Sequence, residues 1–526
     1  MRTKLALTLL ASALATSALA CSADGDAGQA GEEDDLTSNS ALSRDLTFQG
    51  KVYVRKDAAD YEVMSAVKAQ TQTAFGALRT SDIAVNSREL KEVDPATFKK
   101  RNVTVIDPAK SLDAGTEMTE VTYLYKDSAV VDKKYARKTS IPLAVMNPGY
   151  RSQIDRILKE CTPNDEHSRE FSSSAWYIFE PGLPQCKAAI KAEQEKIGAD
   201  RGKLKKAEQV AQSEVDRLYL PITAKLGANK TNKGESYPEY DRLYSGGVEP
   251  GKLVVGLVYG MIDHQRSGGP ESDYGFSQYM DNLREILTEV PALKITKIEG
   301  VQGDLSSVKL ASGKTVNLKL ADIVSLGEWG GGPAGLTSAE RDEVKKLVGQ
   351  ALYLHWVTFE APVSVKIGDQ AEKQSIVKIL GYFGAESGSQ PHKFGIKNSD
   401  VFIYNGHSYI GYGPLDPSNF TAADFPKSYQ IMFVDGCVSY NYYEKDYIPL
   451  KDGGTKNLDL ITNGIEAPSY RSGYALGRFV ATLLNGKQAS YRELLAAASA
   501  TDALRVVDGE VDNAYAPSRT PIVVKK

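Results

Sequence analysis

Two residues that could act as a base and a nucleophile follow apolar runs in the carboxyl-terminal half of the chain. His407 and Ser408 come directly after "VFIYNG", and Cys437 comes directly after "IMFVDG". Two enzyme classes use such residues. In a serine esterase Ser408 would be the nucleophile, and in a cysteine peptidase His407 would be the base for Cys437.

The sequence argues against the esterase. Its G-x-S-x-G motif needs a second glycine so that a helix can pack close to the strand, and Ile410 stands there. Pro414 and Pro417 break the helix that should follow the serine. No histidine follows His407, although the esterase triad places its histidine after the serine.

The cysteine chemistry fits the pattern better. An imidazole that takes the proton of a thiol makes it a useful nucleophile. His407 and Cys437 end two successive predicted strands, and neighbouring parallel strands lie about 5 Å apart. The backbone N–H groups of Ser408 and Cys437 are then expected to face a developing oxyanion. Cys437 is also the odd thiol of an exported chain, so the alternative is a buried, inert cysteine.

These strand ends resemble the caspase-like cysteine peptidases, and the gingipain-type members are closest. The resemblance covers roughly residues 250–500. It implies catalytic roles for His407 and Cys437 and an acyl-enzyme, with a substrate pocket at the end of "LITNG". The pocket residues expected there are Thr462, Asn463 and Gly464. Tyr440 is expected either to wall the cleft or to pack under the loop.

Two features leave alternatives open. The family usually carries glycine after the histidine, and Ser408 stands there, so the alternative is an inactive relative that works as a binding or scaffold module. Selectivity for arginine or lysine would need a pocket carboxylate, for which Asp459 and Glu466 are the candidates.

The elements that must position these residues form an α/β pattern. Residues 246–526 are expected to be a caspase-like domain, a mostly parallel sheet flanked by helices. Its strands include the continuous apolar run of 253–261. Alternating segments between about 301 and 384 predict a β-rich insertion. No cofactor and no metal site is expected, because the histidines show no ligand spacing.

Residues 46–150 alternate between strand and helix patterns, which predicts a small α+β accessory domain. Residues 151–245 are expected to be a loop and a charged helical arm. In that loop Cys161 and Cys186 are placed to form a disulfide, because export exposes the chain to oxidation. This part gathers no catalytic residue types, so a removable propeptide is an open alternative.

The amino end predicts export. Arg2, Lys4 and a short apolar run ending at Ala20 form a signal peptide, residues 1–20. Cys21 follows the cleavage site and resembles a lipidated cysteine, which predicts a membrane anchor in the cell envelope; a periplasmic or secreted protein is the alternative. Residues 21–45 are polar and acidic and predict a flexible tether. The expected partner is a protein or peptide substrate, and a net charge of -4 without a basic stripe argues against nucleic acid.

Overall fold

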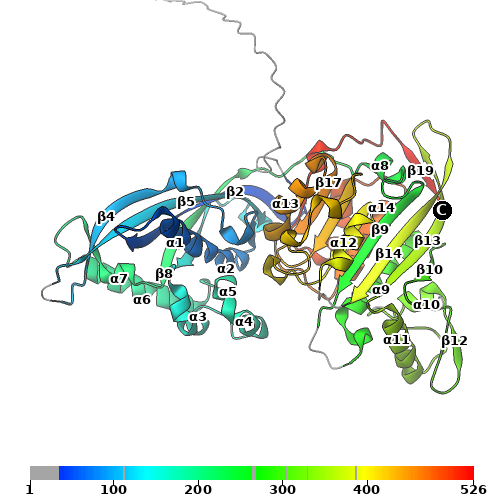
Figure 1. Ribbon diagram of the computed structural model, residues 1–526, viewed down its shortest axis with the longest axis horizontal. Helices are drawn as coiled ribbons and strands as arrows, with labels where there is room; N and C mark the ends of the chain where they lie inside the picture. Colours follow the sequence, from blue (N-terminus) through cyan, green and yellow to red (C-terminus); the bar gives the residue numbers. More distant parts are fainter. Residues whose placement is uncertain (1–34, 111–112, 264–267, 302–304, 329, 385–387) are drawn as a thin grey trace, which may run out of the picture. The chain divides into compact units, whose positions relative to one another are not determined.

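The structure of the protein is a computed structural model that describes residues 35–526, except 111–112, 264–267, 302–304, 329 and 385–387 (Figure 1). The expected signal peptide, Cys21 and most of the expected tether lie outside the described residues. Asp34–Lys526 form one compact unit. No helix in the described ranges is long and apolar enough to cross a membrane.

The larger of two main sheets lies in the carboxyl-terminal part and has ten strands in the order β1-β18-β17-β16-β15-β9-β14-β13-β10, with β19 beside β13. The five strands from β17 to β14 are parallel, and Figure 1 shows β9, β14 and β13 side by side. The strands are β1 Leu36–Thr37, β9 Lys252–Gly260, β10 Lys294–Ile298, β13 Trp356–Ile367, β14 Lys373–Gly384, β15 Val401–Asn405, β16 Gln430–Asp435, β17 Leu458–Asn463, β18 Arg505–Asp508 and β19 Ile522–Lys525.

Helices cover both faces of this sheet, which is why β15, β16 and β17 are buried at every residue. One face packs against α9 (Tyr274–Glu289), α14 (Ser472–Leu484) and α15 (Tyr491–Ala497). The other packs against α12 (Gln390–Lys397) and α13 (Tyr440–Tyr447). The α/β class predicted from the sequence is therefore confirmed.

The expected β-rich insertion at 301–384 is wrong as a separate unit. β14 pairs in parallel with β9, and β13 pairs with β14, so both belong to the main sheet. β13 shows alternating burial, which in sequence looks like a half-exposed accessory strand. The elements outside the sheet are the hairpin β11 Ser307–Lys309 with β12 Thr315–Asn317, and α8 Tyr240–Tyr244, α10 Leu320–Val324 and α11 Ser338–Leu352.

The second main sheet has seven strands in the order β6-β8-β2-β5-β4-β7, with β3 beside β5. Because β7 and β8 come from residues beyond 200, the expected boundary near 150 is wrong: the predicted arm returns to the sheet. The strands are β2 Ala41–Arg55, β3 Ile83–Val85, β4 Lys99–Ile106, β5 Thr116–Asp132, β6 Ser140–Met146, β7 Gln209–Ala211 and β8 Tyr219–Asn229. The helices are α1 Asp60–Gln72, α2 Ala74–Arg79, α3 Ile154–Glu160, α4 Glu166–Glu170, α5 Ala175–Ile178, α6 Pro184–Arg201 and α7 Gln212–Val215.

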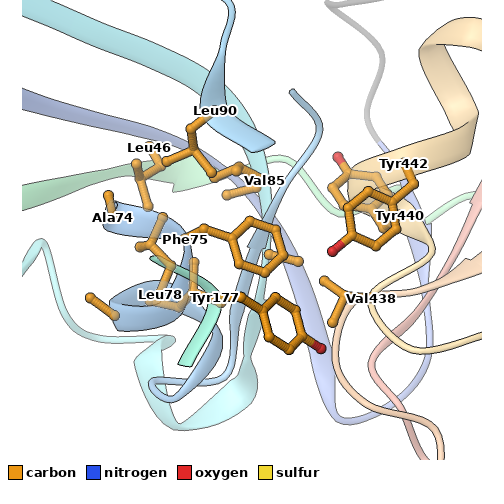
Figure 2. Packing of buried hydrophobic residues seen from close by; sticks show 14 of the residues in the cluster. Leu46, Ala74, Phe75, Leu78, Val85, Leu90, Tyr177, Val438, Tyr440 and Tyr442 are labelled. Carbon is orange, nitrogen blue, oxygen red and sulfur yellow. The ribbon is translucent and has the colours of Figure 1, made fainter. Parts of the chain in front are cut away.

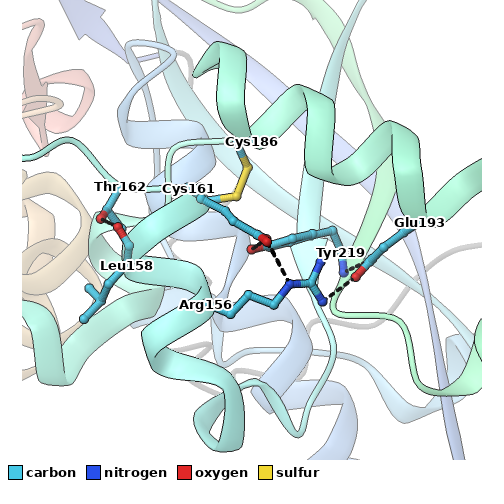
Figure 3. The surroundings of a disulfide bond; sticks show 8 residues. Arg156, Leu158, Cys161, Thr162, Cys186, Glu193 and Tyr219 are labelled. Atoms are coloured by element: carbon cyan, nitrogen blue, oxygen red, sulfur yellow. Dashed lines mark hydrogen bonds and ion pairs between the residues drawn. A yellow bond between two sulfur atoms is a disulfide. The ribbon is translucent and has the colours of Figure 1, made fainter.

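The predicted disulfide between Cys161 and Cys186 is confirmed. It joins the end of α3 to the first turn of α6 (Figure 3). Arg156 of α3 pairs with Glu160 at 3.0 Å and with Glu193 of α6 at 2.8 Å. Covalent and ionic links therefore hold the same two helices together.

The expected flexible tether ends earlier than residue 45. β1 adds to the edge of the ten-stranded sheet, where Leu36 lies opposite Val507, and β2 begins at Ala41. The position of β1 was not visible in the sequence, because residues 21–35 are polar and β1 itself contributes only Leu36 as an apolar anchor.

One apolar core joins the second sheet to one face of the ten-stranded sheet (Figure 2). Phe75 of α2 stacks between Tyr177 of α5, at 5.5 Å, and Tyr442 of α13, at 6.1 Å between ring centroids. Val438, next to Cys437, belongs to the same core. The amino-terminal part is thus packed directly onto the loop that carries the candidate nucleophile.

Candidate active site at the ends of the parallel strands

The loops that carry His407 and Cys437 leave the same edge of the sheet side by side. Asn405, the last residue of β15, is paired with Asp435, the last residue of β16. Each candidate therefore lies two residues beyond a paired position. A Cβ atom on Gly436 would lie 3.4 Å from the Cβ of Ser408, so the two loops are in contact.

A backbone carbonyl orients the imidazole. The His407 Nε2 atom lies 2.9 Å from the carbonyl oxygen of Ile262, which follows β9 on the far side of β15. Because a carbonyl only accepts, Nε2 carries the proton and Nδ1 is the acceptor nitrogen of the neutral ring. The ring also packs edge-on against Tyr409 at 5.6 Å. This tautomer is the one in which Nδ1 can act as a base.

Cys437 sits in a setting that keeps its thiol protonated. Burial raises the pKa of the thiol to about 12, and the negative charge of Glu466 adds to the increase. A hydrogen bond from the Ala467 amide and the charge of Arg79 lower this pKa by less. A nearby base must therefore take the proton for the sulfur to react at neutral pH.

The backbone around both loops is held in unusual conformations. Tyr409, Ile410 and Val438 have φ values of 50°, 54° and 51°, in the left-handed region that non-glycine residues rarely adopt. Such residues cost stability and cluster at functional sites, where the surrounding packing maintains them. They lie directly after His407-Ser408 and after Cys437.

The amides expected to serve the oxyanion are compatible with that role. Among the backbone hydrogen bonds of the described residues, none uses the N–H of Ser408 or Cys437 as donor. The Ser408 carbonyl, by contrast, accepts a bond from the Tyr443 hydroxyl at 3.2 Å. A second bond, from the Gly411 amide at 2.8 Å, also holds this loop through the Ser408 carbonyl.

The expected pocket residues lie next to the Cys437 loop but are buried. The Nδ2 atom of Asn463 donates to Asp435 at 2.7 Å, and Thr462 and Gly464 flank it at the end of β17. Tyr440 is fully buried in the core shared by the two sheets. The expectation that Tyr440 walls an open cleft is therefore wrong, because the amino-terminal part covers it.

The two candidate carboxylates lie in different places. Asp459 is near the start of β17, at the opposite end of the strand from the Cys437 loop, and it is fully buried. Glu466 follows the end of β17, and its negative charge raises the pKa of the Cys437 thiol. Only Glu466 is placed to meet a substrate group beside Cys437.

Glu466 already has a partner in the amino-terminal part. Arg79, the last residue of α2, forms an ion pair with it, and the Arg79 guanidinium lies 4.7 Å over the ring of Tyr177. Sequence reasoning missed Arg79, Tyr177 and the Ile262 carbonyl. A main-chain carbonyl has no sequence signature, and the two side chains come from a region without catalytic patterns.

A row of polar residues crosses the sheet just below the two loops. Tyr259, Asn405 and Asp435 are paired on β9, β15 and β16, and Asn463 is paired with Arg505 on β17 and β18. Arg505, which is 1% exposed, bonds to Asp435 at 3.3 Å and to the Ala498 carbonyl. Hydrogen bonds to Asp435 therefore link the end of β16, just before Cys437, to β17 and β18.

Asp263 and His264 follow the end of β9. Asp263 donates its N–H to Asp273, and His264 lies outside the described residues. In the ranges that the structure describes, no group of three His, Cys, Asp or Glu residues is arranged to hold a metal ion. Comparisons of the chain with models of protein families, with curated proteins and with solved structures give no match.

Proposed function

We propose that the chain is an exported cysteine peptidase of the caspase-like type, with Cys437 as nucleophile and His407 as base. One observation carries the proposal. The two residues follow adjacent, in-register parallel strands, and the Ile262 carbonyl fixes the imidazole as the tautomer that can accept a proton. The resemblance to caspase-like peptidases requires this placement at neighbouring strand ends.

The chemistry follows from the protonation states. As the sulfur of Cys437 bonds to the peptide carbonyl carbon, Nδ1 of His407 takes the thiol proton. The N–H groups of Ser408 and Cys437 would stabilise the oxyanion. The imidazolium then protonates the leaving amine, and water hydrolyses the thioester that links the acyl group to Cys437.

The substrate class and the location belong to the same proposal. A peptide or protein substrate would bind along the end of β17, beside Thr462, Asn463 and Gly464. The amino-terminal signal sequence supports export, and acylation of Cys21 would tether the protein to the cell envelope.

A second candidate function is a binding or scaffold module that retains the dyad without turnover. The observation that favours it is the burial that raises the pKa of the Cys437 thiol to about 12. Ser408, in the position where the family usually has glycine, adds a side chain beside the site.

Hydrolysis of a fluorogenic peptide pool tests the two candidates. We expect slow turnover by the wild-type chain, no turnover by Cys437→Ala, and at least about a hundredfold loss in His407→Ala, because a positioned base contributes that much. Thermal unfolding of each variant checks folding. If neither the wild type nor Arg79→Gln, which removes the ion pair with Glu466 beside Cys437, cleaves any peptide, the binding module replaces the enzyme.

A further inference from the structure

We propose that Glu466 and Tyr177 form a guanidinium-binding site beside Cys437, and that Arg79 of the same chain occupies it as an inhibitory cap. The binding site stands on the contacts below. Its role as a regulator of peptide cleavage rests on the proposed function.

Three different interactions hold the Arg79 guanidinium. It pairs with the Glu466 carboxylate, its Nε donates to the Tyr177 carbonyl at 3.3 Å, and it lies 4.7 Å over the Tyr177 ring. Charge, direction and ring stacking together suit a planar guanidinium better than an ammonium. The Arg79 side chain is 13% exposed, so these contacts are largely shielded from water.

The site adjoins the thiol through its own backbone. The carbonyl of Ile465, directly before Glu466, accepts from the N–H of Val438 at 3.1 Å. The amide of Ala467, directly after Glu466, lowers the pKa of the Cys437 thiol. Any guanidinium on Glu466 is therefore held next to Cys437.

The segment that presents Arg79 is rigid. A Cβ atom on Gly76 of α2 would lie 2.7–2.8 Å from the carbonyl oxygens of Trp176, Tyr177 and Phe179, so α2 touches this backbone directly. Phe75 stacks on Tyr177 and on Tyr442 of α13 (Figure 2). Arg79 and Tyr177 thus reach Glu466 as one packed unit.

The rate at which iodoacetamide alkylates Cys437 at neutral pH, measured by peptide mapping, reports whether Arg79 limits access to the thiol. The assay does not require peptide cleavage. Arg79→Gln keeps part of the aliphatic side chain but removes the positive charge and the planar guanidinium group. We expect its alkylation to be at least about tenfold faster than that of the wild type, because opening the cap exposes the thiol. Loss of the positive charge alone would raise the thiol pKa and slow the reaction, so acceleration reports access.

Arg88→Gln is the matched control. Arg88 also bridges the two parts of the protein, through Asp416 and the ring of Tyr412, but it does not touch Glu466. We expect the alkylation rate of this variant to stay within about twofold of the wild type, because the ion pair between Arg79 and Glu466 stays intact. If alkylation is accelerated equally in both variants, the contact between the two parts of the protein has loosened in general, and the proposal that Arg79 caps the site is rejected.

Small ligands then test the chemical class of the vacated site. In Arg79→Gln, N-acetyl-arginine amide should slow alkylation, whereas the uncharged N-acetyl-citrulline amide should not. Protection by both compounds, or by neither, would overturn the guanidinium site. The double variant Arg79→Gln/Glu466→Gln should lose the protection.

Peptide cleavage separates this inference from the proposed function. Faster cleavage in Arg79→Gln supports both the cap and the enzyme. Faster alkylation without cleavage supports the guanidinium site as a binding site and counts against the peptidase. Unchanged alkylation with cleavage in the wild type rejects the cap and keeps the enzyme.

Discussion

Asp459 shows at the scale of one residue how burial changes a carboxyl group. Its side chain is fully buried on β17 and accepts hydrogen bonds from Tyr429, Tyr491 and Asn513. Burial raises the pKa of this carboxyl to about 7, and the hydrogen bonds only partly offset that increase. The residue is therefore part of a pH-dependent core, not of a substrate pocket.

Asp459→Asn should make the protein less sensitive to pH. The folded pKa is about 7 and the unfolded pKa about 4, so the stability contributed by the bound proton is complete below pH 4 and is lost as the pH rises through 7. The variant should lose about 4 kcal/mol less unfolding free energy than the wild type over this range, since each pKa unit corresponds to about 1.4 kcal/mol. Urea unfolding at several pH values measures it.

The exposed Asp369→Asn is the control for this prediction. It should follow the wild-type pH dependence. If Asp459→Asn follows it as well, Asp459 is ionised in the folded protein at neutral pH and the assignment fails.

The placement of His407 and Cys437 at neighbouring strand ends was accessible to sequence reasoning for a clear reason. Both residues follow apolar runs that only a doubly covered parallel strand explains, and such strands end at a common edge. The orienting carbonyl of Ile262 and the ion pair of Glu466 with Arg79 were not accessible. They depend on contacts between segments that are far apart in the chain.

At the scale of elements, the contact between α9 and α14 depends on two glycines. A Cβ atom on Gly473 would lie 2.0 Å from the carbonyl oxygen of Gln278, and one on Gly477 would lie 2.8 Å from that of Asn282. Helix backbones that approach so closely leave no room for a methyl group. These two helices cover the face of the sheet below the candidate site.

Gly473→Ala should therefore destabilise the protein although alanine favours helices. We expect a loss of about 2–4 kcal/mol, because the added methyl group overpacks a buried contact. Gly198→Ala, within α6, is the matched control, since a Cβ atom there meets nothing within 4 Å. That variant should gain about 0.5–1 kcal/mol from helix propensity. Thermal or urea unfolding of both variants tests the contrast, and equal effects would contradict it.

Strands that are buried on both faces could be predicted from the sequence. Strands that pair with segments far away in the sequence could not. The apolar runs of β9, β15 and β16 identified these strands directly, and β17 was recognised although Asp459 interrupts its apolar residues. β8 was missed because Pro221 interrupts its strand pattern. Its partners β2 and β6 lie far away in the sequence, and no local pattern signals such pairing.

At the scale of the whole molecule, the amino-terminal part is built into the carboxyl-terminal part. β1 is an edge strand of the ten-stranded sheet, and one apolar core includes residues of both parts. Asn441 of α13 donates to the carbonyls of Val85 and Ser87. These contacts bear on the alternative that the amino-terminal part is a removable propeptide.

Cutting the connection between the two parts should not separate them. Lys233 lies in an exposed connecting segment, where an inserted protease site would be accessible. After cleavage we expect both fragments to elute together in size-exclusion chromatography, because the shared core stays buried. Dissociation without denaturant would show that the interface is weak and that release by proteolysis is feasible. The uncut insertion variant is the control.

Arg79 and the Glu466 site belong to the same polypeptide chain, and this affects how well a free ligand can compete with Arg79. A tethered group competes at an effective concentration that is about millimolar even for a flexible linker. The rigid packing of α2 against Tyr177 raises that figure further. A peptide that offers one guanidinium must exceed this local concentration, so it displaces Arg79 only when other parts of the peptide also bind. The intact protein should therefore bind short cationic peptides poorly at the Glu466 site. Long peptides should bind there, because their additional contacts compensate for the displacement of Arg79.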